Sequence, residues 1–158
     1  MRKGKNTKGA TNLLQIVQYK NGPFTLSTDR ALVQVDRVCE FLARSYWANT
    51  RDRATIIKSL KHSLCFSLFH GQTQIGLARV VTDGATFAYL CDVFIDEEFR
   101  GQGLGKWLVK CILQHPDITN VKRVLLATKD AHGLYEQFGF QSPRHPEQLM
   151  EKIISPST

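Results

Sequence analysis

The spacing of hydrophobic residues divides the chain into a helical part and a strand-rich part. Apolar residues recur every three or four positions over 32–46 and 52–62, which predicts two amphipathic helices. Two short strands, over 13–19 and 24–27, are expected ahead of these helices. They are separated by the turn sequence Asn21-Gly22-Pro23, so the chain is expected to begin with a small strand pair and then a helix pair.

The middle of the chain changes from helical spacing to apolar runs of strand length. Runs at 64–70, 73–82 and 86–95 are separated by short turn sequences and predict three consecutive antiparallel strands. The run at 86–95 is apolar almost throughout, which is typical of a central strand covered on both faces. Asp83-Gly84 predicts a two-residue hairpin turn, because a type I′ turn needs positive φ at both central residues.

The last third of the chain returns to alternating helices and strands. A helix is expected over 104–112, a buried strand over 123–128 and a short helix over 131–138. Residues 150–154 are expected to form a last strand. An antiparallel meander followed by a strand–helix–strand crossover predicts a single mixed α/β domain over 13–158.

Charge is concentrated at the N-terminus. The 158 residues include 21 Lys and Arg against 14 Asp and Glu, a net charge of +7. Five basic residues precede the first acidic one: Arg2, Lys3, Lys5, Lys8 and Lys20. Residues 1–12 are expected to be a mobile, solvated basic tail, and the lack of aromatic residues in it argues against nucleic-acid binding.

The sequence predicts a cytoplasmic protein that does not enter a membrane. No apolar run reaches the ~18–20 residues of a membrane helix, and no apolar stretch follows the basic N-terminus as in a secretory signal. Cys39, Cys65, Cys91 and Cys111 form no C-x-x-C pair, so they are expected to be free thiols. The five histidines show no metal-ligand spacing, and no metal is expected.

Candidate chemistry lies at 93–106, where a buried strand ends and glycines open a helix. Free amides in the first turn of a helix bind anions, and Arg100 and Lys106 add cationic donors. A P-loop is excluded, because Arg100 stands at its first glycine position and Trp107 replaces its Ser/Thr. The dinucleotide pattern G-x-G-x-x-G fails too, because Lys106 or Leu108 stands at its third glycine.

The pattern that fits is R-x-x-G-x-G, formed by Arg100, Gly103 and Gly105, followed about 30 residues later by L-Y-E-Q-F-G-F at 134–140. With these two motifs the sequence resembles the GCN5-related N-acetyltransferases, the GNAT superfamily, over 64–140. The resemblance implies a mixed sheet, mostly antiparallel, with a splayed parallel pair of strands in its middle. It also implies that acetyl-CoA is the co-substrate.

The resemblance assigns the coenzyme to the glycine loop, whose amides would hold the pyrophosphate. Backbone groups of Phe94 and Ile95 would meet the pantetheine arm and the thioester. Many relatives carry an asparagine seven residues before the motif tyrosine; Thr128 stands there in this chain, with Asp130 as the other candidate. The full set of expected coenzyme-binding residues is Phe94, Ile95, Arg100, Gly101, Gln102, Gly103, Leu104, Gly105, Lys106, Thr128 and Asp130.

Catalytic roles are expected for Tyr135 and Asp92. Tyr135 matches the family tyrosine that faces the thioester sulfur and would protonate the departing thiolate. Asp92 interrupts an apolar strand. Burial is expected to raise its pKa toward a value useful for a general base, and a structural ion pair is the alternative. A two-residue turn at Asp83-Gly84 would leave Arg79 ~13 Å from Asp92, too far to pair.

The acceptor side is expected to involve Tyr46, Trp47 and Arg79. The two aromatic residues would bind an amine by cation–π contact or pack in the core. Arg79 would bind an acceptor carboxylate or form a structural salt bridge.

The expected reaction is acetyl transfer from acetyl-CoA to a primary amine, of a small molecule, by direct attack in a ternary complex. The alternatives are acetylation of a protein lysine or N-terminus, and a non-catalytic acyl-CoA-binding or nucleic-acid-associated module. A homodimer is possible, since dimers are common among proteins of this family.

Overall fold

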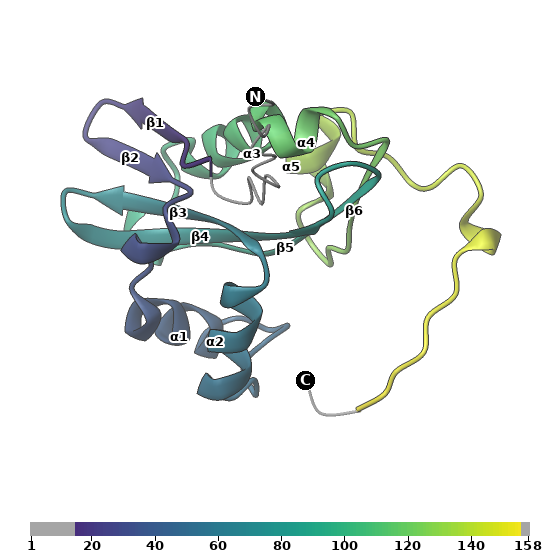
Figure 1. The fold of residues 1–158 in the computed structure, drawn as a ribbon, viewed down its shortest axis with the longest axis horizontal. Coiled ribbons are helices and arrows are strands. Elements are labelled where there is room, and N and C mark those ends of the chain that lie inside the picture. Colours follow the sequence, from purple (N-terminus) through teal and green to yellow (C-terminus); the bar gives the residue numbers. More distant parts are fainter. Residues whose placement is uncertain (1–14, 156–158) are drawn as a thin grey trace, which may run out of the picture.

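A computed structural model describes residues 15–155, which fold around one six-stranded sheet (Figure 1). The predicted tail at 1–12 lies outside the described residues. The strands lie in the sheet in chain order: β1 (Gln18–Asn21), β2 (Phe24–Ser27), β3 (Leu64–His70), β4 (Thr73–Thr82), β5 (Phe87–Ile95) and β6 (Arg123–Leu126). All neighbours are antiparallel except β5 and β6, which are parallel, so the predicted fold class is confirmed.

Helices cover both faces of the sheet (Figure 1). One face carries α1 (Val35–Ala43) and α2 (Arg53–Lys61), which enclose a core with Val38, Leu42 and Leu77. The other carries α3 (Leu104–Gln114), α4 (Pro116–Thr119) and α5 (His132–Glu136). The remaining short elements are the 3-10 turns η1 (Arg30–Leu32), η2 (Glu97–Phe99) and η3 (Pro146–Gln148).

The first predicted helix, over 32–46, is shorter in the structure. Its start is delayed because Gln34 takes an extended backbone conformation and exchanges hydrogen bonds with Gln74 of β4. Its end comes early, because residues after Ala43 form turns. Within the described residues no helix has the length and apolar character needed to cross a membrane.

The parallel strands β5 and β6 separate after four paired positions. Phe87 to Leu90 pair with Arg123 to Leu126, and β5 then continues alone to Ile95 on that side. The backbone beyond Leu90 therefore has no β6 partner. This confirms the splayed parallel pair that the family resemblance implies, but the expected place in the middle of the sheet is wrong, because β6 is the last strand of the described sheet and the pair lies at its edge.

The β4–β5 hairpin differs from the prediction and changes the register. Thr82 pairs with Ala88, so five residues instead of two lie between the last paired positions of the hairpin, and the first of β5, Phe87, is among them. The Asp83 carboxylate accepts hydrogen bonds from the amides of Ala85, Thr86 and Phe87, which stabilises the longer loop. As a result, Arg79 lies opposite Cys91, next to Asp92.

A β-bulge follows directly in β5. Leu77 pairs with Phe94 and Arg79 with Cys91, so Ala78 faces two residues, Asp92 and Val93. Asp92 has φ 51°, the one positive φ of a non-glycine residue in the described chain. A bulge of this kind redirects a side chain out of the regular alternation of the strand.

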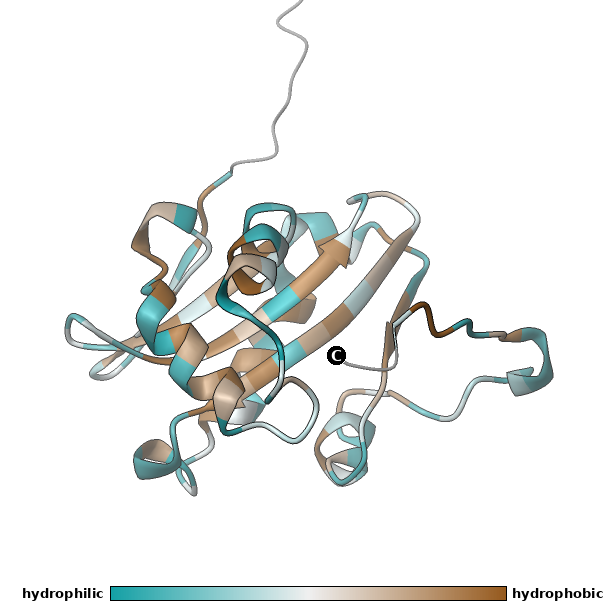
Figure 2. Cartoon of the chain, turned by 90° about the horizontal axis from the view of Figure 1, so that it is seen from below, coloured by the Kyte–Doolittle hydropathy of each residue, from teal (hydrophilic) through white to brown (hydrophobic). Residues whose placement is uncertain are grey.

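The last predicted strand, over 150–154, is wrong. No strand is assigned after β6 within the described residues, and the chain beyond Phe140 runs away from the body of the molecule (Figures 1 and 2). A strand needs a neighbouring strand to pair with, and this segment has none among residues 15–155.

Candidate active site

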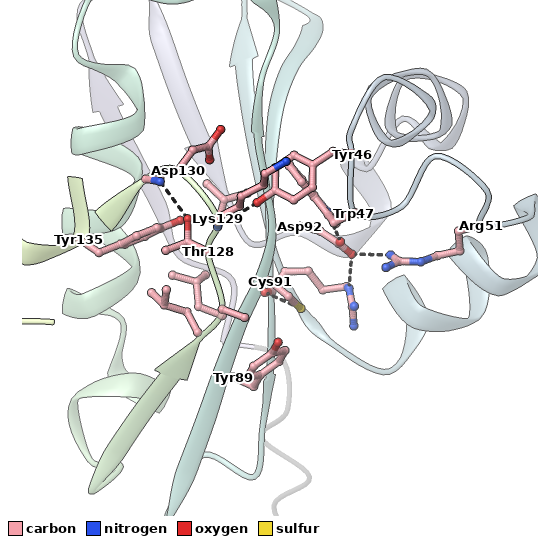
Figure 3. Close-up of a pocket in the computed structure, with 16 residues that line it drawn as sticks. Tyr46, Trp47, Arg51, Tyr89, Cys91, Asp92, Thr128, Lys129, Asp130 and Tyr135 are labelled. Atoms are coloured by element: carbon pink, nitrogen blue, oxygen red, sulfur yellow. Dashed lines mark hydrogen bonds and ion pairs between the residues drawn. The ribbon is translucent and has the colours of Figure 1, made fainter. Parts of the chain in front are cut away.

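Two adjoining cavities lie where β5 and β6 separate. The first, of about 590 Å³, is lined by the loop after α1, by β4 and β5, and by the segment after β6 (Figure 3); we call it the arginine cavity because Arg51 and Arg79 line it. The second, of about 490 Å³, lies against the turn that opens α3, and we call it the glycine-loop cavity. Six residues line both cavities: Tyr46, Trp47, Val93, Asp130, Ala131 and Tyr135.

The glycine loop presents open backbone to the second cavity. Gly101 and Gly103 have φ of 80° and 81°, a left-handed conformation that favours glycine, and a Cβ on either would meet no atom within 4 Å. Gly103 is the N-cap of α3, and its carbonyl accepts the first helical hydrogen bond, from the Trp107 amide at 3.0 Å. The amides of the preceding turn have no partner within the helix, so the loop fits a bound diphosphate.

Arg100 holds the glycine loop against the end of β5. Its Nε donates to the carbonyl of Ile95 at 2.9 Å, and its guanidinium lies 5.0 Å from the centre of the Phe94 ring. The Phe94 ring in turn stacks on Phe41 in the core. Phe94 and Ile95 both line the glycine-loop cavity, and the Phe94 side chain serves packing.

Most of the expected coenzyme-binding residues line the glycine-loop cavity. Gln102 and Lys106 do not line it. The side-chain Nε2 of Gln102 donates a hydrogen bond to the Phe99 carbonyl at 3.0 Å. Thr128 lines the arginine cavity instead. Its hydroxyl accepts a hydrogen bond from the Ala131 amide at 3.0 Å and so fixes the turn that leads into α5.

Tyr135 lies at the junction of the two cavities. It projects from α5, is 7% exposed, and enters the arginine cavity from the side opposite Arg51 (Figure 3). Burial, and to a smaller degree the nearby Tyr46, raises the pKa of the Tyr135 phenol to about 12. The phenol therefore keeps its proton at neutral pH and is able to donate it.

Tyr46 and Trp47 connect the loop after α1 to the sheet side of the site. The Tyr46 hydroxyl accepts a hydrogen bond from the Lys129 amide at 3.1 Å, and the Lys129 ammonium lies 5.5 Å from the Tyr46 ring centre. The Trp47 indole donates to Oδ1 of Asp92 at 2.9 Å. Tyr46 thus connects the loop after α1 to the segment after β6. The indole N–H of Trp47 is used in its hydrogen bond to Asp92.

Asp92 is the centre of a buried ion pair. Its Oδ2 accepts from Nη1 of Arg51 and from Nε of Arg79, both at 2.8 Å, and its side chain is 2% exposed. Arg79 also donates to the Ser63 hydroxyl at 3.0 Å. The predicted ~13 Å separation from Arg79 was wrong, because the longer hairpin loop moves the register.

The ion pair reverses the expected titration of Asp92. Burial alone would raise the pKa of its carboxyl, but the hydrogen bond and charge of Arg79, together with the charge of Arg51, outweigh burial and hold that pKa below its ordinary value. The expectation of a raised pKa was therefore wrong. Of the two alternatives stated for Asp92 and Arg79, the structural ion pair is present.

Arg51 is the site residue that the sequence prediction missed. It lies in the loop between α1 and α2 and contacts Asp92 from the side of the cavity opposite Tyr135 (Figure 3). The available signal was indirect: a carboxylate within an apolar strand needs a cationic partner, and Arg51 is the first arginine after the two aromatic residues of that loop.

Comparison with known proteins identifies the class of enzyme to which this site belongs. The sequence model of the Acetyltransferase (GNAT) family matches residues 31–140, and the chain belongs to this family of N-acetyltransferases. A protein of Gibberella zeae named "Putative acetyltransferase FG08082" is 30% identical over 145 residues, which cover 78% of this chain and 82% of the relative. The family acts with acetyl-CoA, which agrees with an open diphosphate cradle beside a splayed strand pair.

Two further relatives show how far the likeness extends. The crystal structure of a GNAT-family protein from Xanthomonas campestris has a TM-score of 0.80 and 41% sequence identity, and the match covers 83% of this chain and 93% of that one. The spermine/spermidine N(1)-acetyltransferase of Bacillus subtilis is 42% identical over 66 residues, 39% of this chain and 43% of that protein. The Xanthomonas structure supports the fold over most of this chain, and the Bacillus enzyme matches a shorter segment of it.

Proposed function

We propose that the protein transfers the acetyl group of acetyl-CoA to a primary amine of a small molecule by direct attack in a ternary complex. The observation that carries this proposal is the position of Tyr135, which lines both the cavity at the glycine loop and the cavity at the arginines. A donor held at the first and an acceptor held at the second would meet beside its phenol.

The proposed donor site uses backbone more than side chains. The amides at the start of α3 would hold the diphosphate, and Arg100 would keep the loop in place through its hydrogen bond to Ile95. The backbone of β5 beyond Leu90 lacks a β6 partner and is available to the pantetheine arm and the thioester carbonyl. An amide directed at that carbonyl would stabilise the negative charge that develops on its oxygen.

The proposed reaction forms one bond and breaks one. The neutral amine nitrogen attacks the thioester carbon, the C–S bond breaks, and the thiolate takes the proton of the Tyr135 phenol. The proton lost by the amine passes to solvent, from which the phenol is restored. Because the Tyr135 pKa is raised to about 12, the phenol is in the acid form when the thiolate departs.

Asp92 is not available to take the proton of the amine, because two arginines hold its carboxylate. Asp130 is the other carboxylate of the described chain that lines the two cavities, and we assign it no part in this step. We therefore assign Asp92 as a positioning residue for Arg51 and Arg79. Two guanidinium groups against one carboxylate leave a net positive wall, which favours the neutral form of an amine bound beside it.

The same wall favours an acceptor that carries an anionic group. A guanidinium has five N–H donors in a fork that suits carboxylate and phosphate, and Asp92 accepts from one nitrogen of each arginine. Arg51 and Arg79 are 17% and 13% exposed, so a further hydrogen bond to either would form in a largely desolvated setting. A polycation such as spermidine, in contrast, would be repelled.

The test is a thiol-release assay with acceptors matched in pairs. Each pair holds the amine constant and changes only the anion: an amino acid against its amide, and an amino sugar phosphate against the free amino sugar. Spermidine and a lysine peptide complete the panel. Faster turnover of the anionic members supports the proposal, while preference for spermidine or the peptide contradicts the acceptor class.

The variant Arg51→Gln tests whether Arg51 is the group that binds the anion of the acceptor. We expect the KM of anionic acceptors to rise at least tenfold and the KM of acetyl-CoA to stay within about twofold, since an ionic hydrogen bond contributes about 1.5–3 kcal/mol. Arg53→Gln is the matched control, because Arg53 pairs with the exposed Asp36 at 2.7 Å and lines neither cavity. Absence of thiol release with every amine would favour the non-catalytic alternative.

A further inference from the structure

Three apolar side chains stand side by side across the sheet, outside its core. Val81 of β4 pairs with Tyr89 of β5, and Tyr89 pairs with Leu125 of β6. Paired residues on neighbouring strands point to the same face of a sheet, so the three side chains are neighbours. We call Val81, Tyr89 and Leu125 the apolar row.

The apolar row lies on the face of the sheet that carries α1 and α2. Arg79 pairs with Cys65, which belongs to the core under these two helices. Val81 follows Arg79 by two positions in β4, and residues two apart in a strand share a face. Leu126, which follows the row in β6, points the other way and packs against the core under α3. The row therefore continues the surface on which Arg79 stands.

No helix of the described chain buries this row. Val81 is 44% exposed, Tyr89 and Leu125 are half-buried, and none of the three belongs to the two hydrophobic clusters under the helices. Phe87, two positions before Tyr89 in β5, is 38% exposed and extends the same surface toward the β4–β5 loop. Single exposed apolar residues are common, but a contiguous group of them marks a binding surface.

The row is continuous with the arginine cavity. Tyr89 belongs to both, because it lines that cavity together with Arg51 and Arg79. It lies at the end of the cavity away from Tyr46 (Figure 3). Two positions along a strand span about 6–7 Å, so a small molecule held by Arg79 needs to extend only that far to cover Val81.

We propose that the acceptor carries a large apolar substituent in addition to its anionic group, and that the apolar row binds this substituent. The inference rests on the proposed function and narrows its acceptor class to anionic amines such as the hydrophobic amino acids. The anionic group then lies on Arg51 and Arg79, and the substituent covers Val81 and Tyr89. A polar substituent is disfavoured, because it would lose water on this surface without gaining a hydrogen-bond partner from Val81 or Leu125.

A series of linear 2-amino acids tests the proposal in the wild type. Alanine, 2-aminobutyrate, norvaline and norleucine share the amine and the carboxylate and differ by one methylene group each. Burial of a methylene group contributes about fourfold, so we expect kcat/KM to rise at least tenfold from alanine to norleucine. Glutamine is the matched control, because its side chain is of similar length and ends in a polar amide. Equal kcat/KM for norleucine and alanine, or for norleucine and glutamine, overturns the proposal.

The variant Val81→Ser tests whether the row is the surface that binds the substituent. It removes both methyl groups of a side chain outside the core, so the fold is kept, which circular dichroism verifies. We expect the ratio of kcat/KM for norleucine to that for alanine to fall at least fivefold. Ile57→Ser is the matched control, because Ile57 is also 44% exposed, lies on α2 and lines neither cavity. An unchanged ratio in Val81→Ser overturns the proposal.

Two further results separate this inference from its alternatives. Absence of thiol release with every amine rejects the proposed function and this inference with it, whereas release that stays constant along the series rejects the inference alone. Light scattering tests whether a second copy of the chain covers the row instead. A wild-type dimer that Val81→Ser converts to a monomer overturns the proposal, because the row is then an interface between copies.

Discussion

Nε of Arg79 lies 2.8 Å from Oδ2 of Asp92, although the two residues are one position out of register on neighbouring strands. The bulge at Asp92 brings about this contact, because its positive φ turns the carboxylate out of the strand alternation. Arg51 reaches the same oxygen from the loop that follows α1. The Asp92 carboxylate on β5 therefore connects β4 with the loop between α1 and α2, and it shapes the wall of the arginine cavity.

Asp92→Asn is expected to destabilise the protein strongly. The substitution keeps the size of the side chain but leaves two largely buried arginines without their counter-charge, which costs about 3–5 kcal/mol. Urea denaturation at pH 7 measures the difference. Glu97→Gln is the control: its pair with Arg44 is about half exposed, so its loss costs less than about 1 kcal/mol.

The pH dependence of stability separates this explanation from a packing defect. Because Asp92 has a lowered pKa in the folded state, its stabilisation is complete above the ordinary carboxyl pKa and is lost as the pH falls through the folded-state pKa. The wild type should therefore approach Asp92→Asn in stability at strongly acidic pH. A difference that stays constant from neutral to acidic pH would contradict the ionic explanation.

The sequence predicted those parts of the site that depend on local backbone. The glycines ahead of Leu104 predicted an open backbone at a helix start, and the structure has α3 beginning there, with positive φ at Gly101 and Gly103. Apolar runs of strand length likewise predicted β3, β4 and β5 to within a residue or so. Such signals are contained in each segment and need no knowledge of its neighbours.

The parts that failed depend on contacts between segments. Asp83-Gly84 predicts a two-residue turn, but the Asp83 carboxylate binds three loop amides and stabilises a loop of five residues. That difference alone shifted the register and hid the pairing of Arg79 with Asp92. The strand at 150–154 failed for a related reason, since strand formation requires a pairing partner and this segment pairs with no strand of the described chain.

Gly103→Ala should weaken the interaction with acetyl-CoA at little cost to the fold. At φ 81° an alanine is strained by about 1–2 kcal/mol, and its methyl group would occupy the open space above the helix start. We expect at least a tenfold rise in the Kd of coenzyme A, measured by calorimetry. The control is Gly22→Ala, a turn glycine with φ 56° and equally open surroundings.

The two variants should thus share the backbone strain and differ in coenzyme binding. Equal Kd values for coenzyme A in Gly103→Ala and Gly22→Ala would show that the loop does not hold the diphosphate.

His115 should make stability fall between neutral and mildly acidic pH. It is 1% exposed, its Nδ1 accepts from the Asp117 amide at 3.1 Å, and its Nε2 is buried without a hydrogen-bond partner in the described chain. Burial lowers the pKa of this imidazole, against the smaller opposing effect of Asp117. Near pH 6.5 the unfolded chain therefore takes up a proton on His115, whereas the folded chain does not. The free energy of unfolding decreases as the pH falls through that value.

His115→Asn isolates this contribution, because asparagine keeps a helix-capping acceptor and does not titrate. Urea midpoints at pH 7.5 and 5.5 are compared within each protein. The wild type should lose up to about 1 kcal/mol more than the variant over this interval. Equal losses would mean that the pKa of His115 is not lowered by folding.

Tyr135→Phe should lower kcat by about 10²-fold or more and leave the KM of acetyl-CoA within about twofold, because a general acid acts only as the thiolate departs. With its pKa raised to about 12, the phenol stays protonated across the range in which the enzyme is assayed, so it adds no alkaline limb to the wild-type kcat profile below about pH 10. Tyr19→Phe, a change on the distant strand β1, is the control for loss of a phenol as such. Stopped-flow thiol release separates the chemical step from product release. An equal loss of turnover and acetyl-CoA affinity would assign Tyr135 to binding instead of proton transfer, and the meeting point of the two cavities would then lack its acid.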